Sequence, residues 1–282
     1  MSPYPFPFFR LIRTCAAVAL CLPIASAYSG PKPDGPVLAE DFENASDSGL
    51  YAALAGHRLL EVVPGAGVDG GAALRAAYQG YDQGSRRIVL QYPLGASGTE
   101  FTLNYDVRFH EDFQFTRGGK LHGLAPENRV TGGNRVVPDG WSARVNFSGD
   151  GGVRTYLYSQ RQDGTYGDSV GNGGFRFVKG RYHAVSLHLG LNDSADRVNG
   201  FARIHVDGEL LVEHDDVQFR AVDTEASLIS HLHISTFHGG NRPLWAPRDE
   251  SGEYTTVYAD FDNFAIYRGE RVRTAPGRCW SE

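Results

Sequence analysis

The chain has 282 residues, 35 of them glycine and 14 proline, and a formal net charge of −6 at pH 7. This acidic balance excludes a general electrostatic attraction to nucleic acid, so a polyanionic ligand would need a local basic site. The length is typical of one domain with its own hydrophobic core.

The N-terminus has the pattern of an export signal. Two arginines precede an apolar run over residues 15–24, and Ala25-Ser26-Ala27 follows as a cleavage site. This predicts a signal peptide over residues 1–27, cleaved near Ala27, and a single secreted domain over 28–282 in the extracellular space or periplasm. The apolar run is too short to span a bilayer, so we expect no membrane association.

The number of cysteines and the net charge give further expectations for the mature domain. Cys15 and Cys21 lie in the predicted signal, so Cys279 is left alone and no intramolecular disulfide can form. Loss of the signal's two arginines leaves a net charge of about −8. We expect a monomer that is stabilised by its core.

Most of the chain alternates apolar and polar residues over short segments, which predicts strands with one buried and one solvated face. We expect these strands over residues 101–109, 141–147, 153–158, 185–189, 202–206, 231–235 and 257–267. Glycine-containing turn signals are frequent, and helical periodicity is confined to 47–55 and 221–226. The pattern predicts an all-β jelly-roll sandwich of two antiparallel sheets.

Polar side chains gather on one face of two consecutive predicted strands. Alternation places Ser142 and Arg144 on one side of the first strand, and Arg154, Tyr156 and Tyr158 on one side of the second. The connection 148–152 is short enough for an antiparallel hairpin, so these side chains should be neighbours.

A lysine completes this set. Lys120 lies in a glycine-rich stretch, where a ligand can approach the backbone closely. A lysine and an arginine can neutralise a carboxylate, and tyrosines can exchange protons when positive charge lowers their pKa from about 10. A uronate lyase needs these groups, because it removes the C5 proton of a uronate and protonates the departing O4. The residues leave open which tyrosine is base and which is acid, and Lys120 is an alternative base.

From about residue 99 onward the sequence resembles polysaccharide lyase family 14, whose members cleave alginate or glucuronan. The resemblance is carried, in order, by GGKLHGL at 118–124, GWSAR at 140–144, YLY at 156–158, YGD at 166–168, ISTFHGG at 234–240 and ADFDNFAIY at 259–267. It implies a β-jelly roll with the substrate in a concave cleft, and it implies a catalytic set of Lys120, Ser142, Arg144, Tyr156 and Tyr158.

Further substrate contacts are expected from His122, Asn104, Arg154, His238 and Trp245. Alginate is the favoured substrate and glucuronan the next. A carbohydrate-binding jelly roll without turnover is the alternative from another class. A glycoside hydrolase is less favoured, because none of its candidate carboxylates, Glu40, Glu111 and Glu127, lies on the polar faces described above.

No cofactor is required for this chemistry. A candidate site for a structural calcium ion is the place where the first and last strands meet. It would be formed by Glu40-Asp41 with Asp260 and Asp262. His231 and His233 share a strand face, but no third ligand at a suitable spacing indicates a metal site.

Overall fold

The computed structural model describes residues 35–44 and 48–280, together with Met1, so the predicted signal peptide lies outside the described residues. Two antiparallel sheets face each other. The smaller has five strands in the order β5 (Ile88–Gly98), β13 (Ile229–His238), β7 (Gly118–Ala125), β8 (Ser142–Ser148) and β9 (Val153–Tyr158). Within the described part of the chain, no helix has the length and apolar composition needed to cross a membrane.

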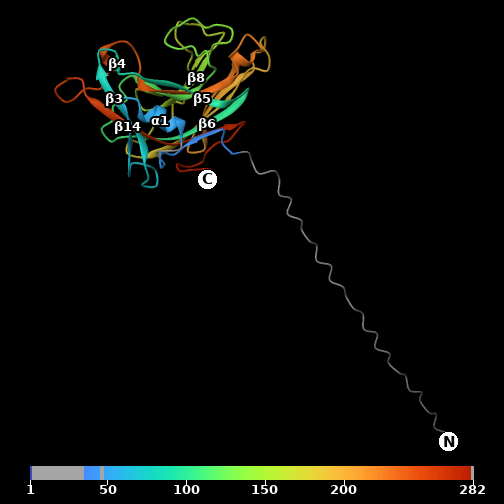
Figure 1. Cartoon of the computed structure of the whole chain (residues 1–282), viewed down its shortest axis with the longest axis horizontal. Coiled ribbons are helices and arrows are strands. Elements are labelled where there is room, and N and C mark those ends of the chain that lie inside the picture. Colours follow the sequence, from blue (N-terminus) through green and yellow to red (C-terminus); the bar gives the residue numbers. More distant parts are fainter. Residues whose placement is uncertain (2–34, 45–47, 281–282) are drawn as a thin grey trace. The chain divides into compact units, whose positions relative to one another are not determined.

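The larger sheet has nine strands, and its main path runs β12 (Glu209–Val217), β11 (Gly200–Val206), β10 (Tyr182–Gly190), β6 (Glu100–Phe109), β14 (Thr256–Arg268), β3 (Ala73–Tyr81) and β2 (Leu60–Val63). In addition, β1 (Leu38–Glu40) pairs with β14, and β4 (Gly84–Ser85) pairs with β3. Figure 1 shows β5 and β8 in one layer and β3, β6 and β14 in the other.

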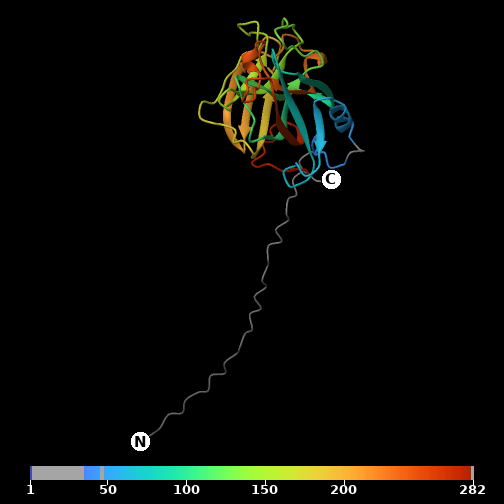
Figure 2. The same cartoon turned by 90° about the vertical axis from the view of Figure 1, so that its left-hand side faces the viewer.

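The core lies between the sheets because both turn their apolar positions inward. From β6 come Leu103, Tyr105 and Val107, and from β8 come Ala143, Val145 and Phe147, all at most 1% exposed. The helix α1 (Gly49–Ala55) adds two buried leucines, and Ser48 caps it by accepting hydrogen bonds from two backbone N–H groups. Figure 2 shows α1 in blue beside the early strands.

The predicted fold class is confirmed, and each of the seven predicted strands lies within or next to an observed one. The helix expected over 47–55 is confirmed as α1. The helix expected over 221–226 is wrong, because only the short 3-10 turn η1 (Glu225–Ser227) forms there. The Ala221 N–H instead donates to the carbonyl of Pro138, which ties this segment to a loop.

The outer face of the larger sheet is covered by the C-terminal segment 269–280. Arg273 forms an ion pair with Asp106, and both side chains are almost fully buried. Asn104 donates a hydrogen bond to the carbonyl of Arg271 and accepts one from Ser186. The predicted substrate contact of Asn104 is therefore wrong, because its polar face packs against the chain's own C-terminal segment.

Candidate active site

Lys120 lies on β7, the central strand of the five-stranded sheet. The pairing of β7 with β8 shifts in register between Lys120 and Gly123, which is typical of a bulge. A Cβ at Gly123 would lie 1.9 Å from the carbonyl oxygen of Ala143, so this close approach requires glycine. The bulge places Lys120 on the outer face of the sheet and His122, two residues later, on the inner face.

His122 is therefore part of the core. It is fully buried, and its ring centroid lies 4.5 Å from that of Phe261 and 5.1 Å from that of Tyr105. Burial lowers the pKa of His122 to about 3, so the ring is neutral. The predicted substrate contact of His122 is wrong, because the bulge turns this side chain into the core.

Arg144 lies on the outer face of β8 and is only 3% exposed. Its Nη1 donates to Ser235 Oγ over 3.3 Å, its Nε has no partner, and no carboxylate of the described residues forms an ion pair with it. Burial lowers the pKa of Arg144 to about 10, so it stays cationic at neutral pH. A buried cation without a counter-charge is costly, so this position favours an anionic ligand.

The two tyrosines of β9 form a pair above this arginine. Their ring centroids are 5.7 Å apart with an interplanar angle of 85°. Tyr158 is fully buried, and its hydroxyl accepts a hydrogen bond from the N–H of Gly133 over 2.8 Å. Tyr156 is half-buried, and burial, with the neighbouring Tyr158, raises its pKa well above 10. Tyr156 therefore stays protonated and can act as an acid.

Lys120 and Arg144 both contact the ring of Tyr156. Lys120 Nζ lies 4.5 Å from the ring centroid, and Arg144 Cζ lies 5.1 Å from it. Burial, together with the charges of Arg144 and Arg87, lowers the pKa of Lys120 to about 7. A large fraction of this amine is therefore neutral near pH 7 and able to accept a proton.

Ser142 belongs to the same strand face but has a different environment. It is fully buried, and its hydroxyl donates to the carbonyl of Val130 over 2.6 Å. Tyr158 is bonded to Gly133 of the same loop, 126–141. Both side chains therefore hold this loop in place beside Lys120, Arg144 and Tyr156.

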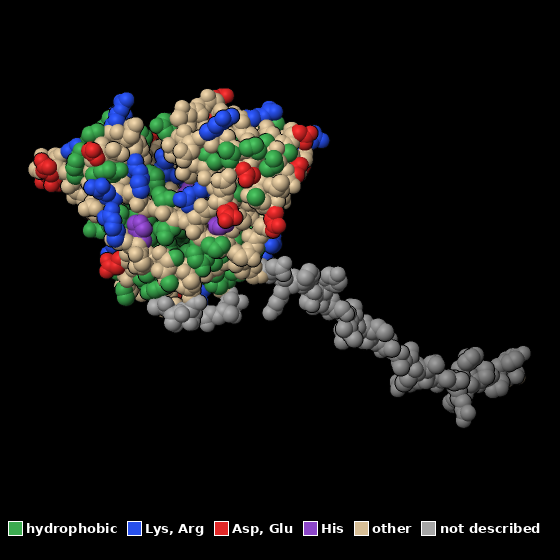
Figure 3. Space-filling model, turned by 45° about the horizontal axis from the view of Figure 1, so that its top comes forward, with side chains coloured by type: hydrophobic (Ala, Val, Ile, Leu, Met, Phe, Trp, Pro, Cys, Tyr) green, Lys and Arg blue, Asp and Glu red, His purple; other side chains and the backbone are tan. Residues whose placement is uncertain are grey.

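Two predicted substrate contacts lie around this cluster. Arg154 is exposed on β9, in register with Asn146, which in turn is opposite Lys120. Trp245 of η2 (Pro243–Trp245) packs against Gly240. The adjacent Gly239 lies next to Lys120, since a Cβ at Gly239 would be 2.9 Å from Lys120 Nζ. Figure 3, in which the side of β5 and β8 comes forward, shows a hollow with lysine and arginine side chains around it.

His238 does not reach this face. It is fully buried, its ring stacks on Phe113 at 5.3 Å, and its Nε2 lies 2.6 Å from the carbonyl oxygen of Gln114. The predicted substrate contact of His238 is wrong, because alternation along β13 turns Phe237 outward and His238 into the core.

His233 lies beside the candidate active site, although its sequence pattern suggested only a surface residue or a weak metal ligand. It lies on the outer face of β13, and in register only Gly123 separates it from Arg144. It is fully buried, neither ring nitrogen has a partner among the described residues, and burial and two arginines hold its pKa well below 6.5. The sequence signal for this position was the alternation of His231, His233 and Ser235, which places the three side chains on one strand face.

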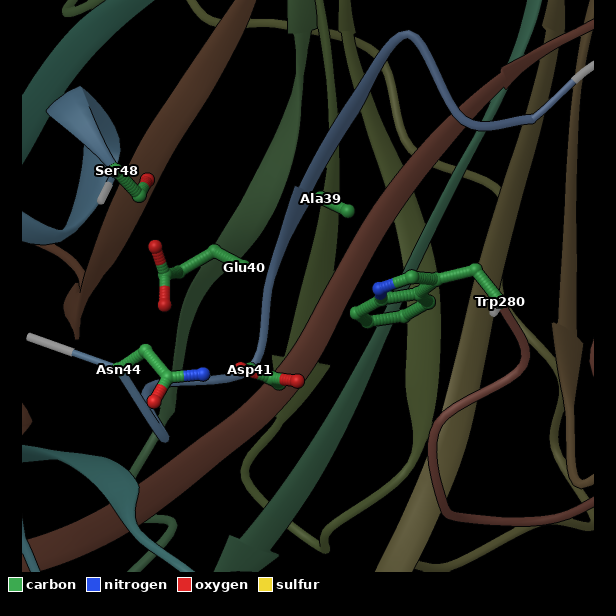
Figure 4. A pocket seen from close by; sticks show the side chains of 6 residues that line it. All are labelled: Ala39, Glu40, Asp41, Asn44, Ser48 and Trp280. Atoms are coloured by element: carbon green, nitrogen blue, oxygen red, sulfur yellow. The ribbon is translucent and has the colours of Figure 1, made fainter. Parts of the chain in front are cut away.

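The acidic residues expected near a calcium ion lie apart from this cluster. Glu40 and Asp41 line a cavity of about 260 Å³ with Ala39, Asn44, Ser48 and Trp280, and Figure 4 shows their carboxylates there. Asp260 is bonded instead to Arg75, Arg108 and His110. Among the described residues, no three His, Cys, Asp or Glu side chains group in a way that could hold a metal ion.

One family model matches most of the chain. The family model described as polysaccharide lyase 14 matches residues 79–261. Alginate lyase Aly36B is 24% identical with a TM-score of 0.65, covering 84% of this chain and 100% of its own. A marine alginate lyase from Aplysia kurodai is 21% identical with a TM-score of 0.65, covering 83% and 100%.

An endo-β-1,4-glucuronan lyase from the fungus Trichoderma reesei is 16% identical with a TM-score of 0.53, covering 78% of this chain and 90% of its own. At these identities the solved structures support the shared fold alone. A comparison with curated proteins gave no match.

Proposed function

The chain belongs to the polysaccharide lyase 14 family, and on this basis we propose that it cleaves a uronate-containing polysaccharide by β-elimination, with alginate favoured. One observation carries the proposal. Arg144 is a buried cation without a carboxylate partner among the described residues, and an amine and a phenol lie next to it. A substrate carboxylate would supply the missing negative charge.

Arg144 would bind the carboxylate of the uronate that follows the scissile bond. A guanidinium can donate two parallel hydrogen bonds to a carboxylate. Neutralising the carboxylate makes the C5 proton more acidic and stabilises the negative charge that develops when the proton leaves.

Lys120 would be the base and Tyr156 the acid. The neutral amine of Lys120 takes the C5 proton, the C5–H electron pair forms the C4=C5 double bond, and the C4–O4 bond breaks. Tyr156 protonates O4, and a proton then returns from Lys120 to Tyr156. The products are an unsaturated uronate and a new reducing end. Tyr158 would position Tyr156, and Ser142 would hold the loop beside it.

The arrangement of base and acid supports a particular stereochemistry. Lys120 and Tyr156 are in contact on the same face of the sheet, so both would approach one side of the sugar ring. H5 and O4 lie on the same side in mannuronate and glucuronate, and on opposite sides in guluronate. This favours mannuronate-rich alginate and glucuronan over polyguluronate.

An ultraviolet assay tests the proposal. Mature protein is incubated with polymannuronate, polyguluronate and glucuronan, and the absorbance of the C4=C5 product is followed, with Lys120→Ala as the control. We expect absorbance to rise fastest on polymannuronate, and about 100- to 10,000-fold more slowly with the variant. Binding to these polymers without any rise would contradict the lyase proposal and favour a carbohydrate-binding protein.

We also propose that the protein is exported after cleavage near Ala27, because its substrate is a polymer found outside cells. N-terminal sequencing of the protein from the culture medium tests this. Recovery of an uncleaved chain only from inside the cells would contradict it.

A further inference from the structure

Asn146 is a buried polar residue that the proposed mechanism does not use. It lies on β8 between the core residues Val145 and Phe147, so its side chain is on the outer face with Arg144. In register it lies opposite Lys120 on β7 and opposite Arg154 on β9. Asn146 is therefore surrounded by the groups of the candidate active site.

The amide oxygen of Asn146 has no hydrogen-bond partner in the part of the chain that the structure describes. The side chain is 6% exposed, and its Oδ1 is buried without a hydrogen bond to any described residue. A buried amide that lacks a partner lowers stability, since it has lost its hydrogen bonds to water. Such a group is suited to a ligand that brings the partner with it.

We propose that Asn146 determines specificity by binding a hydroxyl group of the uronate whose carboxylate lies at Arg144. This inference rests on the proposed function. Two residues along a strand span about 6 to 7 Å. The carboxylate on C5 and the hydroxyls on C2 and C3 lie on opposite edges of a pyranose ring. A ring with its carboxylate at Arg144 therefore turns its C2 and C3 edge toward Asn146.

This placement allows Asn146 to distinguish mannuronate from glucuronate. Mannuronate and glucuronate have the same configuration at C3, C4 and C5, so Lys120 and Tyr156 treat them alike. They differ at C2, where the hydroxyl is axial in mannuronate and equatorial in glucuronate. One fixed amide satisfies one of these orientations better than the other, so Asn146 discriminates the two polymers.

The test compares kcat/KM on polymannuronate and on glucuronan for the wild type and for Asn146→Ala. We expect kcat/KM on the preferred polymer to fall about three- to tenfold, as for one lost hydrogen bond, with a smaller change on the other polymer. Asn146→Ser, which keeps a hydrogen-bonding group, should retain part of the preference. An equal loss on both polymers would show a merely structural role and overturn the proposal.

Asn104→Ala is the matched control, because Asn104 is a buried asparagine on the other sheet. It should lower stability without changing the ratio of the two kcat/KM values. If the wild type cleaves neither polymer, the proposed function fails, and calorimetric binding of mannuronate and glucuronate oligosaccharides still tests Asn146. An affinity ratio that is the same in wild type and Asn146→Ala would then overturn the specificity role.

Discussion

Lys120 and Arg144 lie on neighbouring strands, and they would repel each other if both were positively charged. Burial resolves the conflict, because it lowers the pKa of Lys120 to about 7 while Arg144 stays charged. The two residues can therefore divide the work between a base and a carboxylate ligand.

The pH dependence of turnover follows from Lys120. As the proposed base, Lys120 must be neutral to accept a proton, so kcat/KM should rise as the pH increases through about 7. Lys120→Ala should lower kcat by about 100- to 10,000-fold, whereas Lys179→Ala, on an exposed lysine elsewhere, should not. Initial rates between about pH 6 and 8 measure this rise in kcat/KM, and a flat pH profile would argue against Lys120 as the base.

The two tyrosines should separate on mutation. Tyr156→Phe removes the proton donor, so kcat should fall about 100- to 10,000-fold with a smaller change in KM. Tyr158→Phe removes the hydrogen bond from Gly133, which should lower stability by about 1 kcal/mol and slow turnover less. Steady-state kinetics and thermal melts of both variants decide this. A larger kinetic loss in Tyr158→Phe would reverse the assigned roles.

Among the secondary-structure elements, the bulge in β7 limits which residue positions could be predicted from the sequence. Alternation correctly gathered Ser142, Arg144, Tyr156 and Tyr158, because β8 and β9 pair without a register shift. The inward position of His122 could not be predicted, since nothing in a glycine-rich stretch shows where a bulge forms. Several strands were not predicted, and among them β3 and β7 have patterns that glycine and alanine blur.

The C-terminal segment should contribute stability without contributing to catalysis. Arg273→Ala leaves Asp106 buried and unpaired on the sheet that faces away from Lys120, so we expect a loss of about 3 to 5 kcal/mol. Arg181→Ala breaks an exposed pair with Asp207 and should cost at most about 1 kcal/mol. Denaturant unfolding measures both. Equal losses, or a lower kcat in folded Arg273→Ala, would contradict this assignment.

For the whole molecule, the sequence was sufficient to predict the sandwich, because periodicity and turn signals extend over most of the chain. Burial of the polar side chains could not be predicted. Asn104 lies beneath residues 269–280, and Ser142 beneath the loop 126–141, and both coverings depend on contacts between distant segments.

The charge distribution of the molecule predicts how salt affects turnover. The chain carries a net charge of −6, yet Lys120, Arg144 and Arg154 lie together where the polyanion would bind. Salt screens this attraction, so KM for the polymer should rise between low salt and about 0.5 M NaCl while kcat changes little. Kinetics at several NaCl concentrations test this, with Arg154→Gln expected to show a weaker dependence. A KM independent of salt would contradict it.

Arg144 has no carboxylate partner among the described residues, and this also affects the end of the proposed reaction. The proposed elimination would leave the carboxylate of the sugar intact, so the unsaturated fragment would present the same anion to the guanidinium as the uncut chain. Departure of that fragment leaves the cation unneutralised again. Accumulating fragments should therefore compete with fresh polymer, and digestion should slow well before the polymer is exhausted.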